Sequence, residues 1–478
     1  MSSRLKWVVL GLLVFVAGPP GRCQGEPPRL RVGLLQHRSE VAFSGPAGVT
    51  VQTLIGDQVL AWVPPGEVWK AQLADGRPSA ALGVALALPP GATLSLPKGR
   101  LALVSPAGSQ VEASGGGLRL LPPEGGTVTL HGVEGHWDQR TDRDYRGVIE
   151  VRSTAGELSA VNLVDIETYL RGVVPSEMPP AYPLASLQAQ AVAARGQALT
   201  KAGRHRGEGF DLCSGQHCQV YGGATSEDPR SDQAVASTAG EVLIYNGRPS
   251  APLGVSLAIG AGATPSLSRG RIADTLYASV CGGHTANNED YWTDTAPVPY
   301  LRGQPDFEPE DKVAYQFPLS EQQLRDYLRY APRVHCNQPA YAATEKIRWW
   351  MVVRRDDLAK TLREAVGDFG ELLGVRVGER APSGVVRRLD VIGTRRLVKV
   401  VGGPAVRRAL GGLNSASLAI EAYPDDKGVP VAFAIWGAGW GHQVGMCQVG
   451  AAGLADRGWG YERILSKYYP GCALERRY

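Results

Sequence analysis

The chain has 478 residues, of which 44% are hydrophobic, so it can form two or three packed units with sizeable cores. Its 50 basic and 46 acidic residues leave a net charge of only +4 without a prominent Lys/Arg cluster, which argues against nucleic acid as a partner. The composition also excludes collagen and coiled coil, and the apolar runs are too short for a polytopic membrane protein.

The N-terminal segment predicts export. Arg4 and Lys6 precede an apolar run over residues 7–17, and small or turn-forming residues follow at 18–21. This order is typical of a secretory signal peptide, which we assign to residues 1–24. The run is shorter than the about 20 apolar residues that span a bilayer, and an uncleaved anchor is the alternative reading. We therefore expect an exported protein of the periplasm or cell envelope, in contact with a membrane only through such an anchor.

Export affects how the cysteines are interpreted. Removal of the signal peptide would take Cys23 and leave six, an even number in a compartment where disulfides persist. The remaining cysteines are Cys213, Cys218, Cys281, Cys336, Cys447 and Cys472. Their spacing does not fix a pairing, and they are too few for a disulfide scaffold.

Short alternating apolar and polar runs, broken by glycine and proline, predict a β-rich region over residues 25–145. Strands are expected at residues 30–35, 49–52 and 127–130, and a hairpin at 148–152 and 158–164. Residues 146–478 then have a mixed pattern, so the chain as a whole is assigned to the α+β class. Helices are expected at 183–201, 320–330, 356–366 and 461–468, and strands at 385–401 and 418–423.

One segment is duplicated. Residues 76–101 closely resemble residues 247–272. A single duplication does not make a solenoid, and neither copy contains an acid, a histidine or a cysteine. We interpret both copies as a surface hairpin or insertion without chemistry of its own.

Glu177 is the first candidate for chemistry. It lies among prolines directly before the alanine-rich stretch at 183–201, where a rigidly held carboxylate could act as a general acid and base. A helix N-terminus favours the ionised form, so an apolar or sugar-covered cleft would have to raise its pKa. The alternative is that Glu177 caps the helix. Arg195, among small residues on the same helix, could bind substrate or form a structural ion pair.

A second candidate is a metal site. Cys213, His217 and Cys218, with His205 upstream, supply thiolates and imidazoles of the kind that bind zinc. The spacing matches no common zinc finger, and a disulfide between Cys213 and Cys218 is the alternative. With four protein ligands such a zinc would be structural, because catalysis needs an open position.

Two glycine-rich stretches complete the set. In residues 277–292, Gly282 and Gly283 would let backbone approach a ligand closely, and flanking aromatic side chains suit stacking on a sugar. In residues 436–448, His442 stands at the tip of a tight loop. A nucleophile pair of Cys281 and His442 is conceivable, although nothing in the sequence places the two together.

Taken together and in this order, these stretches resemble the SpoIID/LytB family. The matching segments are VVPSEMP at 173–179, LQAQAVAAR ending at Arg195, DLCSGQHCQVYGG at 211–223, LYASVCGGHTANNEDYW at 276–292, GWGHQVGMCQVGAAGLADRG at 439–458 and ILSKYYPG at 464–471. The resemblance runs from about residue 29 to residue 471. Extra sequence lies at about 249–272 and 303–350.

The resemblance implies a mixed α/β core with helices flanking a substrate groove. It also implies a lytic transglycosylase that cleaves peptidoglycan glycan, preferably strands stripped of stem peptides, to 1,6-anhydro-muramyl ends. Glu177 would be the acid and base, Arg195 and Tyr277 would line the groove, and Gly282, Gly283 and His442 would shape it. Some family members carry zinc in the loop that matches Cys213, His217 and Cys218.

Two alternatives remain. The chain could be a non-catalytic module that binds glycan or a peptidoglycan amidase, in the manner of an amidase enhancer, or a zinc hydrolase that uses the Cys213 cluster. One departure from the family favours the binding module: residues 447–449 are Cys-Gln-Val, where members often have Ser-Gln-Tyr.

Overall fold

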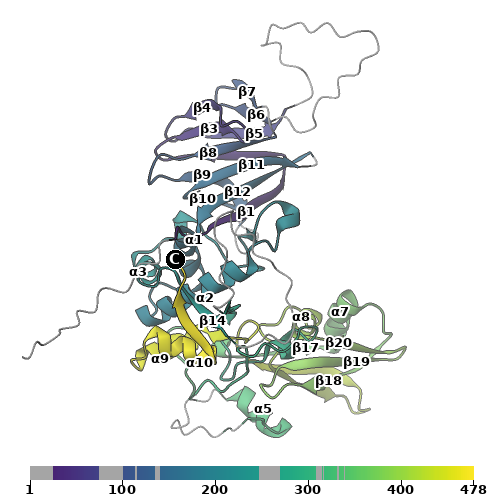
Figure 1. Ribbon diagram of the computed structural model, residues 1–478. Coiled ribbons are helices and arrows are strands. Elements are labelled where there is room, and N and C mark those ends of the chain that lie inside the picture. Colours follow the sequence, from purple (N-terminus) through teal and green to yellow (C-terminus); the bar gives the residue numbers. More distant parts are fainter. Residues whose placement is uncertain are drawn as a thin grey trace, which may run out of the picture.

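The computed structural model describes residues 25–74, 101–113, 116–134, 140–154, 156–246, 270–307, 315, 317–330, 333–338 and 340–478. The expected signal peptide, Cys23 and almost all of both repeat copies lie outside these residues. Within them the fold is α+β, as predicted: a β-sandwich, a layer of helices and a further β-rich unit follow one another along the molecule (Figure 1).

Two sheets form the sandwich. The first has the order β13 (Leu212–Cys213), β1 (Arg29–Arg38), β12 (Glu157–Asp165), β11 (Val148–Thr154), β8 (Gly117–Leu121), β3 (Val49–Thr53) and β4 (Val59–Val63). The second has the order β10 (Arg140–Tyr145), β9 (Val128–Glu134), β2 (Glu40–Ser44), β5 (Trp69–Leu73), β6 (Leu101–Val104) and β7 (Gln110–Ala113). Alternate residues point inward, as Val49 and Val51 of β3 do. The expected strands and the 148–164 hairpin are confirmed.

The expected boundary at residue 145 divides the first sheet. β11 pairs with β8, and β12 pairs with β1, so strands from both sides of that position share hydrogen bonds. The sandwich also shares one hydrophobic core with the helices that follow. Residues 25–145 are therefore not an independent domain, because a composition change along the chain says nothing about which strands pair.

A buried helix organises the middle layer. α2 (Leu184–Lys201) contacts α1 (Ile166–Glu177), α3 (Pro229–Ser237), α9 (Gln448–Asp456) and α10 (Tyr461–Tyr468). It is buried on nearly all sides, and its many alanines allow this close approach. The fully buried Leu187 alone contributes roughly 2 kcal/mol by leaving water.

α1 was not expected from the sequence. Asp165 begins it by accepting a hydrogen bond from the Thr168 N–H at 3.0 Å, and Pro175 lies inside its last turn. The prolines around Glu177 predicted a turn, whereas packing against α2 and α3 keeps the segment helical to Glu177.

Short strands join distant motifs. β16 (Tyr277–Ala278) pairs in parallel with β23 (Met446–Cys447), which places the third and fourth sequence motifs side by side. The sheet of β15 (Arg271–Ile272), β14 (Glu241–Tyr245) and β24 (Cys472–Arg476) brings the C-terminus back beside α2 (Figure 1).

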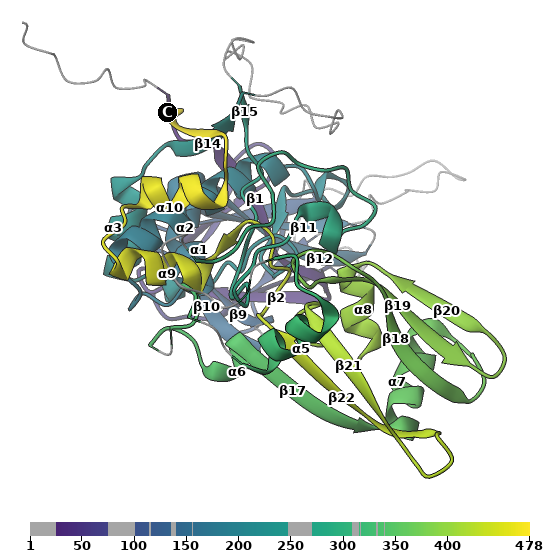
Figure 2. The ribbon, with the colours of Figure 1, turned by 90° about the horizontal axis from the view of Figure 1, so that it is seen from below.

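A second unit lies between those two motifs in sequence. It contains the sheet of β17 (Arg348–Arg354), β22 (Pro430–Ala438) and β21 (Leu418–Pro424), and the sheet of β18 (Leu372–Arg380), β19 (Val386–Gly393) and β20 (Leu397–Val401). The helices α7 (Arg355–Val366) and α8 (Gly403–Ala409) pack against these sheets, and the unit projects from the helical layer (Figure 2). It has its own core, which includes Leu362, Phe369 and Phe433. The expected insertion at 303–350 covers only the start of this unit, whose last strand ends at Ala438.

Shorter helices lead into this unit: α4 (Asn288–Tyr291), α5 (Glu321–Arg329) and α6 (Thr344–Ile347). The single-turn 3-10 helices Arg206–Glu208 and Ala224–Ser226 flank β13. Among the residues described, no helix is long and apolar enough to cross a membrane.

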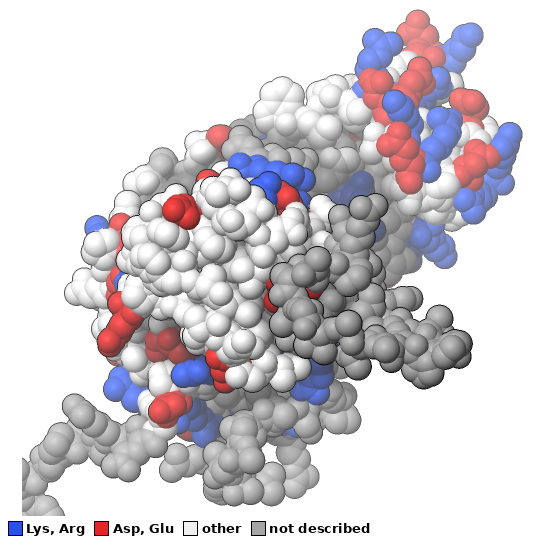
Figure 3. All heavy atoms as spheres, turned by 90° about the horizontal axis from the view of Figure 1, so that it is seen from above, with Lys and Arg blue, Asp and Glu red and all other residues white. Residues whose placement is uncertain are grey.

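Charge is unevenly distributed over the surface. Viewed from the sandwich end, the near face is largely uncharged, while basic and acidic side chains are interspersed on the more distant part at the upper right (Figure 3). In the second unit many such charges are paired, for example Arg388 with Asp390 at 2.9 Å and Arg387 with Glu379 at 3.0 Å. The sandwich carries exposed apolar side chains, among them Ile55 and Trp62.

Candidate active site around Glu177

Glu177 is the last residue of α1, not the first of α2. Its carboxylate oxygen Oε1 accepts a hydrogen bond from the Val220 N–H at 2.7 Å, and its backbone carbonyl accepts one from Gln448 Nε2 at 3.1 Å. The expectation that Glu177 stands at the N-terminus of the alanine-rich helix is wrong, since Pro183 holds that position without a side-chain cap. The Val220 N–H therefore holds the carboxyl group of Glu177, and Gln448 holds its backbone.

This environment changes the acidity of Glu177. The side chain is only partly exposed, and its removal from water raises its pKa from 4.5 to about 7, although the Val220 hydrogen bond opposes the rise. The carboxyl end of a helix is negative and does not stabilise an anion, in contrast to the N-terminal position that the sequence suggested. Within the part of the chain that the structure describes, no second carboxylate contributes to this shift.

Tyr277 lies close enough to Glu177 to interact with it electrostatically. Its hydroxyl donates to Gln219 Oε1 at 2.7 Å, and Gln219 directly precedes Val220. The ring is buried, and burial raises the pKa of its hydroxyl well above the ordinary value. Tyr277 was expected to line a groove; in this position it supports the segment that holds Glu177.

His442 lies beside Trp292. Its Nδ1 accepts a hydrogen bond from the Val444 N–H at 3.0 Å, the Tyr277 backbone is a second hydrogen-bond partner, and its ring centroid is 5.0 Å from that of Trp292. Burial lowers its pKa to about 3, so the ring is neutral. Both side chains are partly exposed. His442 is thus linked to the backbone of Tyr277, and both of its ring nitrogens have hydrogen-bond partners.

The four residues expected to bind metal do converge. One ligand atom from each of His205, Cys213, His217 and Cys218 lies within 4.8 Å of the others. His205 Nε2 is 3.2 Å from His217 Nδ1 and 3.5 Å from Cys218 Sγ. A tetrahedral zinc would set such nitrogen–nitrogen and nitrogen–sulfur edges at about 3.4 and 3.6 Å. Glu208 accepts from His205 Nδ1 at 2.7 Å, an arrangement that orients a ligand histidine. The donor set fits zinc.

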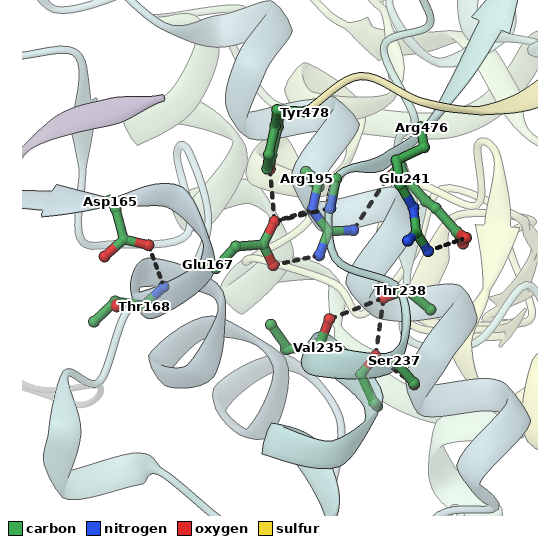
Figure 4. Close-up of polar contacts among 12 residues, drawn as sticks. Asp165, Glu167, Thr168, Arg195, Val235, Ser237, Thr238, Glu241, Arg476 and Tyr478 are labelled. Carbon is green, nitrogen blue, oxygen red and sulfur yellow. Dashed lines mark hydrogen bonds and ion pairs between the residues drawn. The ribbon is translucent and has the colours of Figure 1, made fainter. Parts of the chain in front are cut away.

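Arg195 forms a structural ion pair, the second of the two roles that its sequence suggested. It has no exposed surface, and its Nε and Nη2 donate to the two carboxylate oxygens of Glu167 at 2.8 and 2.7 Å. Its Nη1 donates to the Glu241 carbonyl at 3.0 Å, and Tyr478 reaches Glu167 from the C-terminus at 2.6 Å (Figure 4). Arg195 therefore cross-links α1, α2, β14 and the chain end, and it is too deep to touch a glycan.

Gly282 and Gly283 form a buried turn. Both have positive φ, and a Cβ on Gly283 would stand 2.1 Å from the Tyr327 hydroxyl oxygen. Tyr327 donates that hydroxyl to the Gly282 carbonyl at 2.6 Å. Both glycines are buried, and the turn lets two segments pack closely. Cys281, next to it, contacts the sulfur of Cys336 at 3.7 Å, so the conceivable pair with His442 does not form.

Two cavities lie elsewhere. One of about 660 Å³ opens between α5 and β18, and one of about 190 Å³ is lined by residues that include His284 and Phe317. Glu177 lines neither of these two cavities. The chemistry of Glu177, not cavity size, identifies the candidate site.

Three contributors to the site were missed. Val220 acts through its backbone N–H, for which a sequence offers no signal. Gln219 and Gln448 lie inside the quoted motifs, but only the folded chain shows that they face Tyr277 and Glu177.

Comparison with known proteins supports the motif assignment. Residues 154–245 match the family model described as stage II sporulation protein (SpoIID), and residues 286–445 match a domain of unknown function, DUF8618. The second match contains the whole second unit, from β17 to β22. The first includes Glu177, Arg195 and the whole candidate metal loop.

Three relatives illustrate the similarity. The amidase enhancer of Bacillus subtilis is 27% identical over 314 residues, which cover 64% of this chain and 40% of the relative. An uncharacterized protein of Brachyspira hyodysenteriae is 26% identical over 72% of this chain and 73% of its own. The stage II sporulation protein D of Bacillus subtilis is 26% identical over 68% of this chain and 78% of its own. The matched part thus spans less than half of the amidase enhancer.

Proposed function

Because the chain belongs to the SpoIID/LytB family, we propose that it is an exported peptidoglycan lytic transglycosylase with Glu177 as its general acid and base. The family supports a cell-wall-related function at the coarser level. The observation that carries the finer proposal is the pKa of about 7 at a partly exposed carboxyl group. Such a group is about half protonated near neutral pH, so it can give a proton and then take one.

The geometry suits a mechanism with one carboxyl group. Oε1 is held by the Val220 N–H, which leaves Oε2 to carry the reacting proton. That proton passes to the glycosidic oxygen as the bond from the muramyl C1 to this oxygen breaks. The C6 hydroxyl of the same muramyl residue attacks C1, and its proton passes to the Glu177 carboxylate. The product is a 1,6-anhydro-muramyl end, and no second carboxylate is needed, unlike in ordinary glycosidases.

The residues His205, Cys213, His217 and Cys218 would hold a structural zinc. When bound, zinc would cross-link the loop at 205–218, which ends two residues before Val220. The metal site would thereby position the Val220 N–H, which donates a hydrogen bond to Glu177. Four protein ligands leave no open coordination position, which argues against a zinc hydrolase at this loop.

The experiment is mass spectrometry of peptidoglycan, intact and amidase-treated, after digestion by the purified chain. We expect anhydro-muramyl products from the parent chain and none from Glu177→Gln. Glu345→Gln, a change at an exposed glutamate of α6, is the matched control and should cleave like the parent. If neither substrate yields products although the chain still binds glycan, the catalytic proposal fails.

The second candidate function is a binding module that stimulates a peptidoglycan amidase. Its support is the similarity to the amidase enhancer and the Cys-Gln-Val departure at 447–449. The test adds the chain to an amidase acting on purified cell wall. Stimulation that is equal for the parent and Glu177→Gln would favour this function, whereas stimulation lost in Glu177→Gln would favour the enzyme.

A further inference from the structure

A second cysteine cluster lies apart from the loop at 205–218. Cys281, Asp306, Cys336 and Cys447 come from four separate segments, and all four are buried. One ligand atom from each lies within 4.8 Å of the other three. We call these four residues the second cysteine cluster.

The spacing of the sulfurs fits a metal better than a disulfide. Cys281 Sγ and Cys336 Sγ are 3.7 Å apart. Two thiolates on a tetrahedral zinc are separated by about 3.8 Å, given bonds of about 2.3 Å, whereas a disulfide joins sulfurs at about 2.05 Å. One disulfide would also leave the third sulfur of the cluster unused, and the six cysteines that the structure describes are all free.

Hydrogen-bond donors surround the ligand atoms. The Gly283 N–H donates to Cys281 Sγ at 3.4 Å, and the N–H groups of Cys281 and Gly450 donate to Cys447 Sγ at 3.2 and 3.3 Å. Cys447 is the N-cap of α9, where the helix end favours a negative charge. These donors suit thiolates.

Hydrogen-bond donors also surround the carboxylate of Asp306. One of its carboxylate oxygens accepts the Cys336 N–H at 2.8 Å and the other accepts the Tyr468 hydroxyl at 2.8 Å. Both donors are neutral, so they orient the carboxylate without cancelling its charge. As metal ligands the three cysteines would be thiolates, and three buried thiolates beside a carboxylate are stable only with a cation among them.

We propose that the second cysteine cluster binds a structural zinc ion through Cys281, Cys336, Cys447 and Asp306. The donor types and tetrahedral spacing are those that zinc takes among common cations. The ion ties the segments at 306 and 336, which lead into the second unit, to Cys447. Gln448, the next residue, donates to the Glu177 carbonyl, so this site anchors the helix that supports the candidate acid. It also gives Cys447 a role where family members often have serine.

The test counts metal ions on the full chain, purified without reductant or chelator. Elemental analysis by mass spectrometry should find two zinc ions per chain, one for each group of ligands. Cys447→Ser, which restores the residue usual in the family, should reduce this to one. The double variant Cys213→Ser/Cys218→Ser should also retain one, and replacement of its zinc by cobalt should give the thiolate-to-cobalt absorption of a tetrahedral site.

A second measurement on the parent chain needs no variant. Alkylation of the denatured chain in the presence of a chelator, without reductant, should modify Cys281, Cys336 and Cys447. A peptide pair joined by a Cys281–Cys336 disulfide would overturn the proposal. One zinc per chain that is unaffected by Cys447→Ser would overturn it too.

Discussion

The carboxylate of Glu177 and the backbone N–H of Val220 are joined by a hydrogen bond of 2.7 Å. This contact links the end of α1 to the loop that carries Cys213, His217 and Cys218. The candidate acid is therefore held by the candidate metal loop, although 43 positions separate the two residues in sequence. Substitutions in the loop should therefore alter the position of the Glu177 carboxyl group.

The raised pKa of Glu177 predicts a pH-dependent activity. The resting acid must be protonated, and its pKa is about 7, so glycan cleavage should fall as the pH rises through 7. An unshifted glutamate, with a pKa of 4.5, would place this limb more than two units lower. The measurement is the rate of anhydro-muramyl release on amidase-treated glycan between pH 4 and 9. A rate that stays constant from pH 6 to 9 would contradict the assignment.

Disruption of the loop should reduce stability and activity together. Cys213→Ser removes one ligand, so zinc content and melting temperature should fall, and cleavage should weaken because Val220 loses its fixed position. Cys472→Ser, at a cysteine outside both clusters, is the control and should leave all three unchanged. Activity lost on chelation while the melting curve of the parent stays the same would instead indicate a catalytic metal.

Arg195 should matter for folding and not for glycan contact. Arg195→Met leaves the partly exposed Glu167 without its charged partner, and we expect a loss of about 3 kcal/mol in the free energy of unfolding. Adding Glu167→Gln should recover part of it, since no unpaired charge then remains. Arg140→Met, at an exposed position, is the control. Denaturant unfolding gives the free energies, and a stable Arg195→Met that no longer binds glycan would refute the structural role.

Gly283 offers a matched pair of alanine substitutions. Gly283 and Gly412 both have positive φ, but a Cβ would collide with Tyr327 only at Gly283 and would meet nothing within 4 Å at Gly412. Gly283→Ala should therefore lose about 1–3 kcal/mol more than Gly412→Ala, the usual cost of overpacking. Thermal and denaturant unfolding compare the two. Equal stability with glycan binding lost only in Gly283→Ala would mean that this glycine contacts substrate.

Much of the fold follows from local pattern. The hairpin at 148–164 and the helix α2 are confirmed because alternation and an alanine-rich apolar stretch reflect burial directly. The helical end at Glu177 was missed because prolines predict a turn unless tertiary packing overrides them. The family resemblance placed Arg195 in the groove, whereas its small neighbours allow α2 to be buried, and Arg195 with it.

The candidate site was only partly predictable. A carboxylate among prolines identified Glu177, and closely spaced cysteines and histidines identified the metal loop. Contacts between distant segments, such as Val220 with Glu177 or Cys281 with Cys336, depend on tertiary structure and leave no trace in spacing. The second unit was underestimated for the same reason, since strands β17 and β22 pair across 75 residues or more of intervening chain.

The fate of solvent oxygen during cleavage tests the proposed reaction of Glu177 most directly. Amidase-treated glycan is digested by the purified chain in water labelled with heavy oxygen, and the new muramyl ends are analysed by mass spectrometry. Because the C6 hydroxyl is the proposed nucleophile, we expect anhydro ends without label and no cleavage by Glu177→Gln. Labelled, hydrated muramyl ends would contradict this proposal, since they would require water as the nucleophile.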